Sequence, residues 1–185
     1  MNDNKRVIGR NDTGLVHIYC GNGKGKTTTG MGLCVRAAGY GYPVLIYQFM
    51  KDNGTSERKI LEQVPNIKIV DGPDKIKFSF AMTEEEKKQE RIFNDEQFER
   101  VTQMAVQGNY RVLFMDETVY AIRAGLLDED KVLQFLKNKP EDLEVILTGQ
   151  DPSDRLIEAA DYVSEIRKIR HPFDDGVPAR VGIER

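Results

Sequence analysis

The residues best suited to chemistry form one glycine-rich stretch, whose members are Gly21, Asn22, Gly23, Lys24, Gly25, Lys26, Thr27 and Thr28. It follows an apolar run at residues 15–19 and opens a run that suits a helix. A glycine loop between a strand and a helix can aim several N–H groups at one point, and the helix dipole adds to their attraction for phosphate. The stretch therefore predicts a nucleotide-phosphate site, in which Lys26 supplies a positive charge and the hydroxyl of Thr27 is the usual magnesium ligand.

The loop departs from the common phosphate-binding pattern G-x-x-x-x-G-K-[ST]. Cys20 stands where the first glycine belongs, and Gly21 leaves only three residues before Gly25. The alternative is a glycine-rich turn that binds nothing. Because a Gly-Lys-Thr triplet stands in register directly after a strand, that alternative is the weaker one.

Two carboxylates end another apolar run. Asp116 and Glu117 follow residues 111–115, a pattern typical of a central parallel strand with its acids at the carboxyl edge of the sheet. Phosphate sites cluster at this edge, so one acid can reach a magnesium ion held with Thr27 while the other orients a nucleophile or binds the ion. Two ordinary acids at a solvated strand end are the alternative.

Other side chains have interpretations that the residues alone leave open. Arg36 lies about two to three turns into the first helix and either leans back toward the nucleotide or is a surface arginine. Gln48 and Lys51 end the second strand at the same edge, where polar groups are either functional or simply terminal. Phe78 and Phe80, two positions apart in an extended segment, would project the same way, and such a pair is more often core than a ligand platform.

The rest of the chain alternates strands and helices. Strands are expected near residues 15–19, 43–49, 67–70, 111–115, 143–149 and 162–169, and helices near 29–38, 56–61, 83–107, 130–137 and 152–160. Thr83 with Glu86 forms a capping box that opens the longest helix. This alternation predicts an α/β fold with three layers and a mostly parallel central sheet covered on both faces.

Composition narrows the function classes. The 185 residues carry 27 basic and 30 acidic side chains, which disfavours nonspecific nucleic-acid binding. No stretch suits a signal peptide or a membrane span, so we expect a cytoplasmic location. Cys20 and Cys34 lack metal-ligand spacing and read as small core residues. We expect a flexible arm at residues 1–14, one domain at 15–170, and an extended tail at 171–185 packed on that domain.

A series of short motifs runs in order over nearly the whole chain. They are the glycine loop 21–28, Val-Arg-Ala at 35–37, Gln-Phe-Met-Lys at 48–51, Asp-Glu at 116–117, Leu-Thr-Gly at 147–149, Asp-Tyr-Val-Ser-Glu at 161–165, His-Pro-Phe-Asp-Asp-Gly-Val at 171–177 and Gly-Ile-Glu at 182–184. Together they resemble the P-loop type of ATP:corrinoid adenosyltransferases, also called cob(I)yrinic acid a,c-diamide or cob(I)alamin adenosyltransferases. The shortened loop and the His-Pro-Phe tail are more specific than a generic phosphate loop.

The resemblance implies that a corrinoid cobalt, reduced to Co(I), attacks the 5′ carbon of ATP and releases the whole tripolyphosphate. It implies that Lys26, the loop amides, Thr27 and Mg²⁺ held with Glu117 neutralise the charge that builds on this leaving group. By the same similarity, Asn22 and Arg36 would also contact ATP.

The resemblance also assigns a second substrate. Phe78 and Phe80 match an aromatic pair that lies against the lower face of the corrin ring, although the family's second aromatic is often Trp. The corrinoid would be cobalamin or cobyrinic acid a,c-diamide, with a flavin-type reductant and a homodimeric enzyme. Two further departures stand out: Gln150, where relatives commonly have Arg, and Arg180, where Gln is frequent.

We therefore predict a single RecA-like P-loop α/β domain that transfers the adenosyl group of ATP to a Co(I) corrinoid. Lys26, Thr27 and Glu117 are its predicted catalytic residues, and Asp116 joins Thr27 and Glu117 as a metal ligand. Neither nucleic acid nor membrane is an expected partner. The alternative is a P-loop ATPase or nucleotide-switched regulatory module, in which Glu117 orients water.

Overall fold

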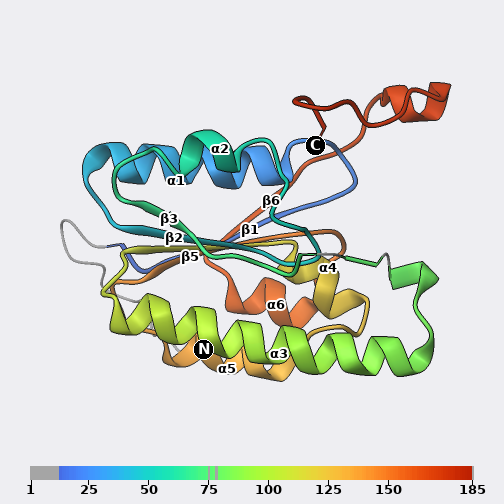
Figure 1. Ribbon diagram of the computed structural model, residues 1–185. Coiled ribbons are helices and arrows are strands. Elements are labelled where there is room, and N and C mark those ends of the chain that lie inside the picture. Colours follow the sequence, from blue (N-terminus) through green and yellow to red (C-terminus); the bar gives the residue numbers. More distant parts are fainter. Residues whose placement is uncertain (1–12, 75, 78, 185) are drawn as a thin grey trace.

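A computed structural model describes residues 13–74, 76–77 and 79–184, so Phe78 and all of the expected arm except Thr13 and Gly14 lie outside the described residues. A six-stranded sheet runs through the described part in the order β3-β2-β4-β5-β1-β6, with every neighbouring pair parallel (Figure 1). The strands are β1 (Val16–Cys20), β2 (Val44–Gln48), β3 (Ile67–Ile69), β4 (Val112–Asp116), β5 (Glu144–Thr148) and β6 (Tyr162–Glu165). The predicted parallel sheet is confirmed.

Helices cover both faces of this sheet, which confirms the three-layer α/β fold. Figure 1 shows α1 (Lys26–Tyr40) and α2 (Arg58–Leu61) on one face, and α3 (Glu84–Gln107), α4 (Thr118–Arg123), α5 (Glu129–Asn138) and α6 (Asp154–Ala159) on the other. Two apolar clusters fill the spaces between the layers, one on each side of the sheet. Cys20 and Cys34 are buried within them, as their sequence context indicates. No helix in the described part of the chain is both long and apolar enough to cross a bilayer.

The most apolar runs form the centre of the sheet. All five residues of β2 and all five of β4 are buried, because helices cover these strands on both sides. The strand β6 lies at the sheet edge, and its four residues are exposed. The carboxyl ends of β1, β2, β4 and β5 therefore meet at one edge, where the glycine loop leaves β1.

The capping box is confirmed. The hydroxyl of Thr83 accepts a hydrogen bond from the Glu86 N–H at 3.2 Å, and the Glu86 carboxylate accepts one from the Thr83 N–H at 2.7 Å. The helix α3 that they open ends at Gln107, directly before Gly108, as its sequence pattern predicts.

Short elements differ from the sequence expectations. Residues Ser79–Ala81 form a 3₁₀ turn, η1, so the expectation that Phe80 stands in an extended segment is wrong. A second such turn, η2 (Pro172–Asp175), opens the tail, and α4 follows β4 directly. Elements of three to six residues hold too few positions for a hydrophobic period to be visible in sequence.

One glycine of α1 permits close packing against the sheet. Gly30 faces Phe114 of β4, and a Cβ at Gly30 would lie 2.5 Å from Cζ of that fully buried ring. Gly32, two residues along the same helix, is exposed and has nothing within 4 Å of a Cβ position. A side chain at position 30 would therefore collide with the core, whereas one at position 32 has space.

We expect Gly30→Ala to destabilise the protein, because overpacking a core costs roughly 1–3 kcal/mol while the better helix propensity of alanine returns at most about 1 kcal/mol. Gly32→Ala should gain up to about 1 kcal/mol from propensity alone. Urea denaturation of both variants measures the difference. Equal shifts in the same direction would show that the contact with Phe114 does not set the distance between α1 and the sheet.

Candidate nucleotide-binding site

The glycine loop is shaped by the chain that follows β6. A Cβ at Gly21 would lie 2.4 Å from the Ile166 carbonyl oxygen, and one at Gly23 would lie 2.8 Å from the Arg167 carbonyl carbon. The Gly23 N–H donates to the Ile166 carbonyl at 2.8 Å. Gly25 has φ +119°, a left-handed conformation, and is the N-cap from which α1 begins. Packing thus requires Gly21 and Gly23, and the entry into α1 requires Gly25.

Lys26 stands at the first position of α1, where the N–H groups of the first turn and the helix dipole attract anions. Its ammonium group donates to the Gly23 carbonyl at 2.8 Å, across the loop. A phosphate in the loop would replace this neutral acceptor with a charged one, and charge-assisted hydrogen bonds are the stronger kind. The lysine is therefore held over the concave side of the loop.

The carboxylate of Asp116 is the most densely bonded group at the sheet edge, and it is fully buried. Oδ1 accepts from the Thr148 hydroxyl at 2.5 Å and from the Thr27 hydroxyl at 3.0 Å. Oδ2 accepts from the Gln48 amide at 3.2 Å and from the Lys51 ammonium at 2.7 Å. A buried carboxylate is tolerated only when its lone pairs are satisfied and its charge is paired, and both conditions are met here.

Lys51 supplies the pairing charge. The chain turns after β2 through Met50, which has φ +55°, and this left-handed residue directs Lys51 back over the sheet edge. Burial alone would lower the pKa of Lys51, but the charge of Asp116 and the hydrogen bond to it outweigh that effect and raise the pKa above its ordinary value. Lys51 is therefore cationic at neutral pH.

Glu117 follows Asp116 but faces a different environment. It has φ +59°, and its N–H donates to the Thr148 hydroxyl at 2.8 Å. This left-handed turn directs the side chain into the cavity beside the loop, whereas Asp116 stays inside the fold. Burial and then the neighbouring Asp116 charge raise the pKa of Glu117, against the opposing charges of Lys51 and Lys26. A nearby cation would favour its ionised form.

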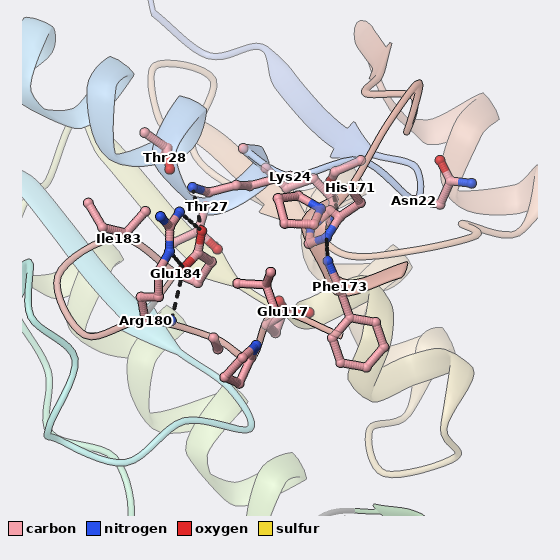
Figure 2. A pocket seen from close by; sticks show the side chains of 17 residues that line it. Asn22, Lys24, Thr27, Thr28, Glu117, His171, Phe173, Arg180, Ile183 and Glu184 are labelled. Atoms are coloured by element: carbon pink, nitrogen blue, oxygen red, sulfur yellow. Dashed lines mark hydrogen bonds and ion pairs between the residues drawn. The ribbon is translucent and has the colours of Figure 1, made fainter. Parts of the chain in front are cut away.

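A cavity of about 370 Å³ lies over the loop, and residues of the tail line its opposite side. Figure 2 shows Arg180, Ile183 and Glu184 on one side, His171 and Phe173 on the other, and Glu117 between them. Glu184 ties the tail to the loop, because its carboxylate pairs with Lys24 of the loop at 3.1 Å and with Arg180 of the tail at 2.8 Å. The tail therefore forms part of the cavity wall.

A second cavity, of about 550 Å³, adjoins the first, and Lys26 and Glu117 line both. Its other walls include Lys51, Gln150 and Tyr120, together with Ser79 of η1. The hydroxyls of Ser79 and Tyr120 lie 2.7 Å apart and share a hydrogen bond, which ties η1 to α4. The next residue, Phe80, is 85% exposed, so the interpretation of Phe80 as a core residue is wrong.

The structure brings most of the predicted site residues together. The loop residues from Asn22 to Thr28 line the first cavity with Glu117, although the side-chain oxygen of Asn22 accepts from the Lys168 N–H at 2.8 Å. Gly21 is buried beneath them, and Asp116 lies behind the cavity. Arg36 is exposed on α1 and lines none of the described cavities, and Phe78 lies outside the described residues.

Sequence reasoning missed the bonding of Asp116 and the covering role of the tail. Thr148 ends the apolar strand β5 at the ligand edge, and a threonine at such a position is a usable signal of a site residue. Gln48 and Lys51 show the same pattern, since they are polar residues at and just after the end of the apolar strand β2. Gln150 and Arg180 also line cavities, Gln150 the second and Arg180 the first.

The oxygen atoms present suit a magnesium ion that a nucleotide brings with it. The described residues contain no group of three or more His, Cys, Asp or Glu side chains placed to hold a metal ion. Nucleotide-bound Mg²⁺ needs only one or two protein ligands, because phosphates and waters supply the rest. Thr27 and Glu117 line the same cavity and provide a hydroxyl and a carboxylate, while Asp116 orients Thr27 from behind.

A glycine loop at the start of a helix, facing acids at the carboxyl edge of a parallel sheet, defines a P-loop nucleotide-binding protein. The KaiC-like protein PH0186 of Pyrococcus horikoshii OT3 shares this fold, with a TM-score of 0.54 and 22% identity over 86% of this chain and 75% of that chain. The family model described as ATP:corrinoid adenosyltransferase BtuR/CobO/CobP matches residues 12–185. The chain belongs to this family.

Curated relatives agree with this membership. A corrinoid adenosyltransferase of Escherichia coli K12 is 30% identical over 181 residues, which cover 95% of this chain and 87% of the relative. A corrinoid adenosyltransferase of a Sinorhizobium species is 30% identical over 180 residues, which cover 94% of this chain and 81% of the relative. The resemblance drawn from the sequence motifs is confirmed at the level of the family.

The two adjacent acids should respond differently to loss of charge. We expect Asp116→Asn to lower the free energy of unfolding by on the order of 2–3 kcal/mol, because it leaves Lys51 unpaired and places an amide donor among donors. Glu117→Gln should leave stability unchanged or slightly higher, because burial and Asp116 disfavour its ionised form. Urea denaturation at pH 7 measures both, and equal losses would contradict the assignment of Asp116 as the structural acid.

Proposed function

We propose that the protein transfers the 5′-deoxyadenosyl group of ATP to the Co(I) centre of a corrinoid and releases tripolyphosphate. The cobalt–carbon bond forms as the bond between C5′ and its oxygen breaks, and the leaving group takes the electron pair. The observation that carries this proposal is that Lys26 and Glu117 line both adjoining cavities. A triphosphate in the first cavity and a bulky second substrate in the other would meet at these two residues.

The proposed roles follow from charge. Lys26 and the free loop amides bind the triphosphate and stabilise the negative charge that grows on it as C5′ departs. Thr27 and Glu117 would hold Mg²⁺, which supplies further positive charge to the same leaving group. Asp116 acts through Thr27, because its hydrogen bond fixes which way the hydroxyl lone pairs point. Arg36 is the weakest of the proposed ATP contacts, since the fold leaves it exposed on α1.

The second cavity is the proposed corrinoid site. Phe80 is 85% exposed on η1, beside Ser79, which lines that cavity. An exposed aromatic ring can lie against the lower face of a corrin ring and exclude both water and the corrinoid's own base. Losing that lower ligand makes Co(II) easier to reduce by a flavin-type reductant. Phe78 belongs to the same proposal, and cobalamin and cobyrinic acid a,c-diamide are the candidate substrates.

A cytoplasmic homodimer completes the proposal. The exposed edge strand β6 and large apolar side chains in the segment that follows it support an interface, since Ile169 is 93% exposed, Phe173 70% and Val181 75%. Hydrolysis of ATP is the alternative, with Glu117 as the group that orients water. Family membership favours adenosyl transfer, and the products decide between the two.

We expect incubation with ATP, Mg²⁺ and chemically reduced cobalamin to give a light-sensitive cobalt–carbon product by absorbance and intact tripolyphosphate by ³¹P NMR. ADP with orthophosphate would instead establish the ATPase alternative.

Lys26→Ala should abolish the reaction, because the variant loses the cation that the first turn of α1 places at the glycine loop. A folded Lys26→Ala protein with near wild-type turnover at saturating ATP would contradict the role of Lys26.

Phe80→Ala should separate cobalt reduction from adenosyl transfer. We expect it to retain ATP affinity and activity on chemically generated Co(I), yet to lose most activity when a flavin reductant must reduce enzyme-bound Co(II). Because the ring is exposed, the free energy of unfolding should change by no more than about 0.5 kcal/mol. The matched control is Ile60→Ala, which removes an exposed apolar side chain from α2, outside the cavities described above. Equal losses in the two assays for Phe80→Ala would remove Phe80 from the corrinoid site.

A further inference from the structure

Lys51 lies where a divalent cation would have to bind. Its ammonium group donates to Asp116 Oδ2 at 2.7 Å and to the Thr27 hydroxyl oxygen at 3.3 Å. A hydroxyl has one hydrogen and two lone pairs. The Thr27 hydrogen is directed at the Asp116 carboxylate, so Lys51 uses the lone-pair side on which a metal ion would also depend.

Two cations do not fit this position together. Magnesium binds its oxygen ligands at about 2.0–2.1 Å, so an ion on Thr27 would lie within a few ångströms of the Lys51 nitrogen. Like charges at this separation in a partly buried site repel strongly, since little water screens them. Only 24% of the Lys51 side chain is exposed, and Asp116 is fully buried.

The cavities around Lys51 offer its ammonium group other positions. It lines the second cavity, beside Lys26 and Glu117, and a third of about 580 Å³ that Glu57 also lines. A triphosphate held by the loop would bring negative charge to the side opposite Asp116. The ammonium group could then exchange its buried partner for the phosphates or for Glu57 without entering apolar surroundings.

We propose that Lys51 is an internal counter-cation of Asp116 that competes with the divalent metal ion for the Thr27 hydroxyl. Without nucleotide, Lys51 neutralises Asp116 and excludes the free ion. The triphosphate draws Lys51 away and lets the ion reach Thr27, so metal and nucleotide enter together. This inference rests on the proposed nucleotide site but not on the corrinoid chemistry.

The test measures Mn²⁺ binding to the full chain without nucleotide or corrinoid, by the electron paramagnetic resonance signal of the free ion. We expect wild-type protein to bind Mn²⁺ weakly and Lys51→Met to bind it about tenfold or more tightly. Lys77→Met is the matched control, because Lys77 lines the same cavity but pairs with Glu86 at 2.7 Å. It removes one positive charge without freeing Thr27, and its affinity should stay near the wild-type value.

Two further variants keep the proposal falsifiable if Lys51→Met folds poorly. Lys51→Gln retains a hydrogen-bond donor without the charge and should also bind Mn²⁺ more tightly. Adding Thr27→Val to either variant should remove the gain, because the metal loses its hydroxyl ligand. Mn²⁺ should raise the melting temperature of the Lys51 variants but not of wild type. If folded Lys51→Met and Lys51→Gln bind Mn²⁺ no more tightly than wild type, Lys51 is not a competitor. Since no adenosyl acceptor is present, this result is independent of whether the protein transfers adenosyl groups.

Discussion

The buried carboxylate of Asp116 is the interaction on which the functional edge of the sheet depends. Its partners come from separate parts of the chain: Thr27 from α1, Gln48 from the end of β2, Lys51 from the turn after β2, and Thr148 from the end of β5. Loss of any of these partners would leave the charge of the Asp116 carboxylate less well satisfied in a low-dielectric interior. The four donors therefore hold the ends of β2, β4 and β5 and the start of α1 in one arrangement. This arrangement also positions the glycine loop, which leads directly into α1.

The same network explains the left-handed residues beside it. Met50 and Glu117 have φ of +55° and +59°, and each follows the end of a central strand. Such conformations cost on the order of 1–3 kcal/mol and persist where surrounding bonds determine them. Asp116 is the residue before Glu117, and its carboxylate also binds Lys51, the residue after Met50, so one carboxylate holds both turns. Their effect is to direct Glu117 into the cavity and Lys51 across the sheet edge.

The layers of the fold were readable from sequence because they depend on local patterns of adequate length. The apolar runs at β2 and β4 and the capping box at Thr83 each specify their element without help from distant residues. The loop, Thr27 and the two acids were readable because their types and order carry the chemistry. The bonding of Asp116 and the turn η1 were not, because they depend on contacts between residues far apart in the chain. Arg36 shows the converse: helix α1 places it on the exposed surface, whatever its motif suggests.

The segment that follows β6 explains why the shortened loop has glycine at positions 21 and 23. Gly21 and Gly23 lie so close to Ile166 and Arg167 that a side chain at either glycine would collide with backbone atoms. The Gly23 N–H, bonded to Ile166, is unavailable to a phosphate. Asn22 accepts from the Lys168 N–H, so the loop is tied along its length to the chain that becomes the tail. Because that tail forms the wall opposite the loop, the contacts between the loop and residues 166–168 constrain both the positions of the glycines and the shape of the cavity.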